Sequence, residues 1–202
     1  MKILIATNNE YKRKQFKYLL QSFPVEVLTL KDLSLTGEVV EDGITARDNA
    51  AIKAKYWGAK AQMVTLGDDA GLEIDALDKK PGVKARRWGG FFNDKVGDEE
   101  WLAHLLKQLE GVPFEKRTAC YRAAWVVVAP DGRELSKDII LDFKITEEPQ
   151  RPYPPGSPMS AVRYFEEYQK IETELSPEEQ WQKLLQEMEG WREFRELLEE
   201  NS

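Results

Sequence analysis

The sequence is poor in the residues from which many catalytic and metal sites are built. Its 202 residues include one cysteine, Cys120, and one histidine, His104. A single cysteine excludes a disulfide within the chain, and the two residues together are too few for the nitrogen and sulfur ligands that zinc prefers. Any metal would therefore have oxygen ligands, which suits magnesium. We interpret Cys120 as a small buried apolar residue and His104 as structural.

An excess of basic residues and long apolar runs are also missing. The net charge is -7, so the chain gains nothing from the nonspecific attraction of cations to a phosphate backbone, and we expect no nucleic acid polymer as a partner. The apolar run after Lys2 has only four residues. It is too short for a signal peptide or a membrane span. We therefore expect a cytoplasmic protein without a membrane partner.

What the sequence does contain is typical of a soluble globular protein. Apolar residues make up 42% and charged residues 32% of the chain, which suits one sizeable core, or one core with a smaller lobe. Periodicity and turn chemistry predict strands at 2–7, 25–30, 63–66, 72–76, 118–129 and 134–145. The same signals predict helices after Asn8 or Asn9 and at 45–61 and 99–109. This alternation, with a hairpin in the middle, predicts an α/β fold with a mixed sheet.

The C-terminal quarter begins with an irregular segment. RPYPPGSP, residues 151–158, contains four prolines, which forbid regular structure. Ser176 and Pro177 then begin the last predicted helix, because serine caps and proline in the first turn favour a helix start. An apolar stripe from Trp181 to Leu198 predicts one long helix. The stripe could pack on the body of the protein or on a second subunit.

Three stretches could carry chemistry. In ATNNEYK, a strand-to-helix junction places Thr7, Asn8, Asn9 and Lys12 where they could cradle a phosphate. The alternative is an ordinary capped helix with a surface lysine.

The second stretch joins Glu41 to the helix that carries Asn49 and Lys53, which lie four residues apart and share a face. The alternative is a solvated helix start with acids near its positive end. The third is GDDAGLEID, which we interpret as a buried strand that ends at two acids, Asp68 and Asp69, before a turn at Gly71. Acids at such a strand end could hold magnesium, and the alternative is an acidic turn.

Five segments in this order resemble one family. They are ATNNxxK, EDGxTxxxNAxxKA, DDAGLEIDAL, PGVxxRRWGG and LLKQLEGVPxEKRTACYRAA, and the resemblance runs from about Lys2 to Pro149. This order is similar to that of the inosine triphosphate pyrophosphatase family, whose members hydrolyse non-standard purine nucleoside triphosphates to the monophosphate and pyrophosphate. The resemblance implies an elongated mixed β-sheet flanked by helices, with two lobes and a central cleft. It also implies a homodimer.

The resemblance also implies roles for individual residues. The implied substrate-binding residues are Thr7, Asn8, Asn9, Lys12, Asn49, Lys53, Ala70 and Arg87. Ala70 stands where the family usually has serine, so one hydroxyl contact is lost. Glu41 and Asp69 are the implied ligands of Mg²⁺, and Asp69 is also the implied catalytic base.

Chemistry supports the same residues independently of the resemblance. Splitting the linkage between the α- and β-phosphates needs neutralisation of the negative charge on several phosphate oxygens, and it needs an activated water. Magnesium with Lys12 and Lys53 would supply the charge, and Asp69 would accept the proton of the water.

The sequence departs from the family pattern after residue 150. The aromatic-x-x-Asp of the family's FGYDP segment is missing, Gln180 replaces a lysine, and Leu184, Leu185 and Gln186 replace Ser-His-Arg. These groups normally recognise the base, so we expect altered base selectivity. We predict one domain over 1–202, with phosphate and metal binding in 1–150 and a divergent loop and helix in 151–202.

Three alternatives stay open at this point. The first is an active nucleoside triphosphate pyrophosphatase with changed base preference. The second is a catalytically inactive relative that binds nucleotide or whose apolar C-terminal helix serves assembly or partner binding. The third is a hydrolase for another small molecule that contains a pyrophosphate linkage.

Overall fold

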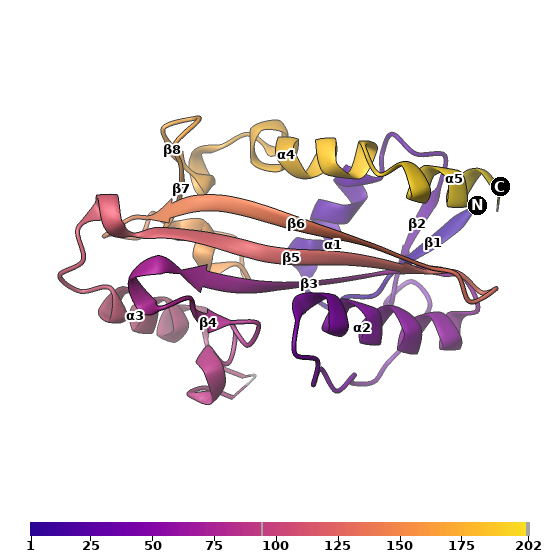
Figure 1. The fold of residues 1–202 in the computed structure, drawn as a ribbon, viewed down its shortest axis with the longest axis horizontal. Coiled ribbons are helices and arrows are strands. Elements are labelled where there is room, and N and C mark those ends of the chain that lie inside the picture. The colour runs from indigo at the N-terminus through magenta and orange to yellow at the C-terminus, as the bar shows by residue number, and fades with distance from the viewer. Residues whose placement is uncertain (94, 201–202) are drawn as a thin grey trace. The chain divides into compact units, whose positions relative to one another are not determined.

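The fold was obtained as a computed structural model, which describes residues 1–93 and 95–200 (Figure 1). The strands are β1 (Lys2–Ile5), β2 (Glu26–Thr29), β3 (Val64–Ile74), β4 (Lys80–Gly82), β5 (Thr118–Val128), β6 (Glu134–Ile145), β7 (Arg163–Phe165) and β8 (Lys170–Ile171). The helices are α1 (Glu10–Leu19), α2 (Ala46–Ala61), α3 (Asp98–Gln108), α4 (Pro177–Glu189) and α5 (Arg192–Glu200).

The strands form a mixed sheet in the order β2-β1-β3-β5-β6-β7-β8, and β4 pairs with β3 beside this path. β1 is parallel to β2 and β3, with Ile5 opposite Leu66. The pairs β3–β4, β6–β7 and β7–β8 are antiparallel. The predicted α/β class, a mixed sheet flanked by helices, is confirmed.

The chain divides into two compact units. The first contains residues 1–69, 123–139 and the C-terminal part from residue 181, and the second contains 70–122 and 140–180. The chain passes between the units within β3, β5, β6 and the first turn of α4. The two units are described separately below.

In the first unit, helices cover both faces of the sheet. Successive residues of a strand point to opposite faces, and the neighbours Trp125 and Val126 of β5 show this. The Trp125 ring lies 5.8 Å from that of Phe16 in α1, whereas Val126 packs with Ala50 and Ala54 of α2. Helix α2 therefore lies on one face and α1 on the other. Figure 1 shows α4 and α5 on the face opposite α2.

The predicted long C-terminal helix is in fact two helices. α4 ends at Glu189 and α5 begins at Arg192, and the break falls at Gly190, a residue that weakens helices because of its backbone freedom. The apolar stripe is buried within the first unit: the rings of Trp191 and Phe194 lie 6.4 Å from Trp125 and 5.6 Å from Phe23, respectively. Of the two alternatives, the stripe packs on the body.

The predicted strand end at the two acids is also wrong. β3 continues from Val64 to Ile74 without a turn. Its two glycines serve close packing instead. A Cβ on Gly67 would lie 2.1 Å from the carbonyl oxygen of Ala50, and one on Gly71 would lie 3.1 Å from the backbone of Gly82. The glycines therefore let α2 and β4 approach a continuous strand.

The second unit has its own core, with α3 packed on the sheet. Buried members of this core are Leu72, Ile74, Trp101, Leu102, Leu105, Phe143, Ile145 and Val162. The Arg117 side chain is buried here and donates hydrogen bonds to the carbonyl oxygens of Leu109, Val112 and Thr146. Three backbone acceptors of the loops around it are thereby satisfied.

The lone histidine and lone cysteine both lie in the second unit. His104 stacks on Phe91 at 4.5 Å between ring centres and also contacts Trp88 and Phe92. Burial lowers its pKa, and the nearby Lys107 lowers it further. Cys120 is buried, and burial raises the pKa of its thiol. Both placements suit the structural roles predicted for these residues.

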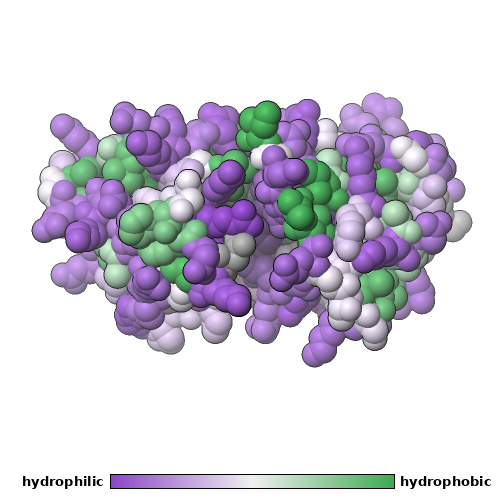
Figure 2. Space-filling model, turned by 90° about the horizontal axis from the view of Figure 1, so that it is seen from below, coloured by the Kyte–Doolittle hydropathy of each residue, from purple (hydrophilic) through white to green (hydrophobic). Residues whose placement is uncertain are grey.

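The surface is largely hydrophilic. In Figure 2, apolar residues on the face shown form separate green patches among hydrophilic residues. In residues 1–93 and 95–200, the large apolar side chains that are exposed are Val40, Ile44, Phe91 and Ile140. None of the described helices has the length and apolar character needed to cross a membrane.

Candidate active site

The loop between β1 and α1 is a capped helix start. Asn9 is the N-cap of α1, and its Oδ1 accepts a hydrogen bond from the Lys12 backbone N–H at 3.2 Å. The Thr7 hydroxyl oxygen accepts one from the Asn9 N–H at 3.2 Å. Asn8 is exposed, and its carbonyl oxygen accepts from Arg13. The loop is therefore held in one shape by its own polar side chains.

Lys12 is not the surface lysine that the alternative interpretation of this helix start required. Its ammonium forms an ion pair with Asp68 of β3, whose side chain is 7% exposed. The contact is an ion pair rather than a hydrogen bond of good geometry. Burial alone would lower the pKa of Lys12, but Asp68, Asp69 and Glu41 outweigh burial and raise it. Lys12 therefore stays charged and lies close to three carboxylates.

Helix α2 brings the second group of polar residues. Its N-cap is Thr45, which forms a reciprocal capping box with Asp48: each side chain accepts a hydrogen bond from the other residue's backbone N–H. Asp48 is thus engaged in starting the helix. One residue further on, the side-chain Oδ1 of Asn49 accepts a hydrogen bond from the Gly43 backbone N–H at 2.8 Å. This bond ties the segment that carries Glu41 to the helix.

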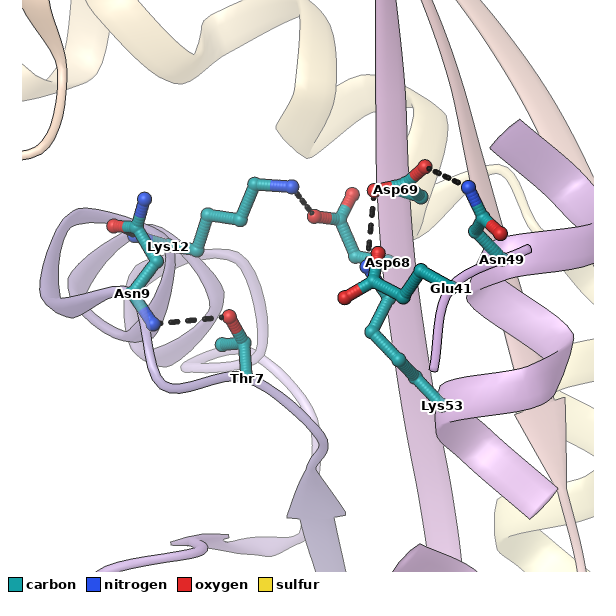
Figure 3. Close-up of polar contacts among 8 residues, drawn as sticks. All are labelled: Thr7, Asn9, Lys12, Glu41, Asn49, Lys53, Asp68 and Asp69. Atoms are coloured by element: carbon teal, nitrogen blue, oxygen red, sulfur yellow. Dashed lines mark hydrogen bonds and ion pairs between the residues drawn. The ribbon is translucent and has the colours of Figure 1, made fainter. Parts of the chain in front are cut away.

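Lys53 joins two carboxylates from separate parts of the chain. Its Nζ donates to Glu41 Oε2 and to Asp69 Oδ1, both at 2.9 Å (Figure 3). The two oxygens therefore lie within twice that distance of each other. Asn49 Nδ2 donates to the second oxygen of Asp69 at 3.2 Å. The Lys53 side chain is 12% exposed and that of Asp69 is 14% exposed, so these contacts are largely shielded from water.

The alternation of β3 explains how two adjacent acids meet different helices. Gly67 faces α2, so Asp69 also points to that side, and Asp68 points to the side of α1. The last backbone bond between β1 and β3 runs from Ala6 N–H to the Leu66 carbonyl oxygen at 2.8 Å. Both acids follow directly after it, beyond the end of β1, although β3 itself continues.

The five charged residues do not balance. Glu41, Asp68 and Asp69 carry three negative charges when ionised, and Lys12 and Lys53 carry two positive ones. One negative charge is therefore in excess at a site whose charged side chains are between 7% and 36% exposed. A triphosphate would increase this excess, so an added cation is needed before the cluster can attract one.

The carboxylates of the cluster suit a hard divalent cation. In the described part of the chain, no three or more His, Cys, Asp or Glu side chains are arranged to hold a metal ion by themselves. Mg²⁺ does not need such a cage, because it commonly takes one or two protein carboxylates and completes its shell with water and substrate phosphate. Glu41 and Asp69, which already share one cationic partner, fit that pattern.

The remaining predicted residues lie in the second unit. Ala70 follows Asp69 on β3 and is half-buried, and Arg87 is half-buried before the 3₁₀ turn Trp88–Gly90. Asp68 was predicted only as one of two adjacent acids that could hold magnesium, and the resemblance implied no role for it. The sequence did not show that Asp68 pairs with Lys12, because this pair depends on how α1 packs beside β3.

Comparison with known proteins gives the family. A family model described as the Ham1 family matches residues 3–180. A dITP/XTP pyrophosphatase of Thermoanaerobacter pseudethanolicus is 34% identical over 183 residues, covering 89% of this chain and 87% of the relative. A dITP/XTP pyrophosphatase of Listeria monocytogenes is 41% identical over 132 residues, covering 65% of this chain and 64% of the relative.

Solved structures agree with this result. A nucleoside-triphosphatase / dITP/XTP pyrophosphatase from Mycobacterium abscessus is 33% identical with a TM-score of 0.65, and the match covers 89% of this chain and 91% of that one. A HAM1 protein from Coxiella burnetii is 24% identical with a TM-score of 0.77 and covers 99% of both chains, which supports the fold alone. The fold is thus that of the Ham1 proteins, and this chain belongs to the Ham1 family.

Proposed function

We propose that this chain is a magnesium-dependent nucleoside triphosphate pyrophosphatase, which hydrolyses a (d)NTP of a non-standard purine to the monophosphate and pyrophosphate. The observation that carries the proposal is the Lys53 bridge between Glu41 and Asp69, with Lys12 on Asp68 nearby. The activity printed for the dITP/XTP pyrophosphatase relatives supports the same reaction.

In the proposed reaction, water is added across the linkage between the α- and β-phosphates, which breaks to release the monophosphate and pyrophosphate. Lys12 and Lys53 bind phosphate oxygens, with Thr7, Asn8 and Asn9 at the start of α1 and Arg87 as a further substrate contact. Glu41 and Asp69 would hold Mg²⁺, which when bound neutralises charge on the phosphates. Asp69 accepts the proton of the attacking water, and Asn49 orients the Asp69 carboxylate through its hydrogen bond.

Altered base selectivity is also part of the proposal, and the C-terminal quarter supports it. Gln180, at the position of the family's lysine, donates to the buried Glu172 at 2.6 Å. Glu172 is also paired with Arg163. The Ser160 hydroxyl is fully buried and bonded to that of Ser157 at 2.8 Å. These polar groups form hydrogen bonds and an ion pair with one another. They are therefore poor substitutes for the missing base-recognising residues.

The inactive alternative loses its main support, because the apolar stripe of α4 and α5 is buried in the first unit's own core. The homodimer, the single-domain organisation and the cytoplasmic location stay predictions.

A panel of standard and deaminated nucleoside triphosphates tests the function. We expect pyrophosphate and the monophosphate in equal amounts from at least one member when Mg²⁺ is present, and none when it is chelated. Release of orthophosphate would reject the proposed bond. No turnover of any member would reject the enzyme.

A further inference from the structure

Lys53 holds the two carboxylates that the proposed function assigns to the metal. We propose that Lys53 is an internal counter-cation that weakens binding of Mg²⁺ alone, so that metal and polyphosphate bind with positive coupling. This inference rests on the proposed function. It concerns how Lys53, the metal and the phosphates exchange partners in the site.

Geometry is the first argument. The Lys53 ammonium lies 2.9 Å from an oxygen of Glu41 and 2.9 Å from an oxygen of Asp69. A divalent cation held by the same two carboxylates would be a close neighbour of that ammonium and would be repelled by it. Because the Lys53 side chain is only 12% exposed, water screens this repulsion poorly.

The second argument is that Lys53 cannot leave the two carboxylates without losing its negative partners. Displaced from both carboxylates, its ammonium would be a shielded cation without a partner, which is costly. The other acid of the cluster, Asp68, already has Lys12 as its partner. The phosphates of a nucleotide would supply the missing negative partner. Lys53 could then turn to the phosphates while the metal takes the carboxylates.

Coupling of this kind is reciprocal. If the nucleotide tightens metal binding by some factor, the metal must tighten nucleotide binding by the same factor. The site would therefore select the metal–nucleotide complex over either component alone.

Calorimetric titration with Mg²⁺ in the absence of nucleotide tests the inference. We expect Lys53→Met to bind Mg²⁺ at least about tenfold more tightly than the unchanged protein, because two carboxylates lose their internal cation. Lys53→Arg keeps the charge and should bind as weakly as the unchanged protein. The matched control is Lys55→Met on the same helix, since Lys55 is 58% exposed and pairs with Glu134; its affinity should not change.

A second titration includes the non-hydrolysable α,β-methylene analogue of inosine triphosphate. We expect it to tighten Mg²⁺ binding at least about tenfold in the unchanged protein and clearly less in Lys53→Met. Lys53→Gln replaces Lys53→Met if the latter does not fold.

The outcomes separate the two proposals. Equal Mg²⁺ affinity of Lys53→Met and the unchanged protein would overturn the counter-cation, even if pyrophosphate is released normally. If Lys53→Met binds Mg²⁺ more tightly but the unchanged protein hydrolyses no nucleotide, the counter-cation is supported and the proposed function is rejected.

Discussion

Gly67 of β3 and Ala50 of α2 are so close that a side chain on Gly67 cannot fit: its Cβ would lie 2.1 Å from the Ala50 carbonyl oxygen. This contact sets the separation between the strand that carries Asp69 and the helix that carries Asn49 and Lys53. The distances in the charge cluster therefore depend on a residue that has no functional group.

Gly67→Ala should push α2 away from β3. Overpacking of this kind costs about 1–3 kcal/mol of unfolding free energy, and displaced catalytic groups can cost on the order of 100-fold in rate. Thermal unfolding and pyrophosphate release would measure the two effects. Gly58→Ala on α2 is the milder comparison, because its Cβ would lie 3.3 Å from Thr65 Oγ1, a tight contact that requires a shift of only a few tenths of an ångström. Equal behaviour of the two variants would contradict this role of Gly67.

Asp69→Asn removes the proposed base but keeps its shape and its capacity to accept a hydrogen bond. We expect kcat to fall by about 10²–10⁴, the usual contribution of a general base, with a much smaller change in melting temperature. Steady-state kinetics with the best nucleotide of the panel would measure it. Asp138→Asn is the control, since Asp138 is 58% exposed and pairs with Arg47. Pyrophosphate release at a nearly unchanged rate would show that another group activates the water.

Glu99 should make the second unit sensitive to acid. Hydrogen bonds from Arg151, and then from Tyr153, lower the pKa of Glu99 from 4.5 to about 2. The folded-state pKa is depressed, so the stabilisation is present above about pH 4.5 and is lost as the pH falls toward 2.

Glu99→Gln should therefore lower the melting temperature at pH 7, by at most about 4 °C because the pair is exposed. The difference from the unchanged protein should shrink as the pH falls below about 4.5 and should vanish only below about pH 2. Thermal unfolding measured across this range checks it, with Glu100→Gln on the same helix as the control. A difference that stays constant with pH would exclude the carboxylate as its source.

Arg117→Lys should destabilise the protein although it keeps the charge. The flat guanidinium of Arg117 donates to three carbonyl oxygens at once, which a single ammonium on a shorter chain cannot reproduce. We expect a loss of about 1–3 kcal/mol in unfolding free energy, measured by denaturant titration. Arg122→Lys, at a side chain that is 57% exposed, should change it by less than about 0.5 kcal/mol. Similar losses in both variants would refute the special role of Arg117.

Elements with strong local signals were predictable from the sequence. Thr45 and Asp48 cap α2 by contacts within four residues, and the turn after β5 returns the chain through β6 as predicted. Such signals depend on neighbours in the sequence, which are known before the fold is.

Elements that depend on distant partners were not predictable in the same way. Gly67 and Gly71 resemble turn residues when β3 is read alone, yet they permit close packing by segments far away in sequence. Likewise, the stripe from Trp181 to Leu198 has one helical period, although α4 ends at Glu189 and α5 begins at Arg192.

The candidate site was predicted in its composition but not in its pairing. Motif order placed Glu41, Lys53 and Asp69 in one site, and the structure brings these three side chains into contact. Which lysine meets which acid depends on the face of β3 to which each side chain points. That assignment required knowing that β3 continues through both acids.

The burial of α5 has a practical consequence for work with shorter versions of the protein. The match of the family model ends at residue 180, and a boundary drawn there would look natural in an alignment. Truncation at this boundary would nevertheless expose the rings of Phe23 and Trp125 to solvent. The resulting exposed apolar surface would promote aggregation. The last twenty described residues therefore cover the core of the first unit and are not a dispensable tail.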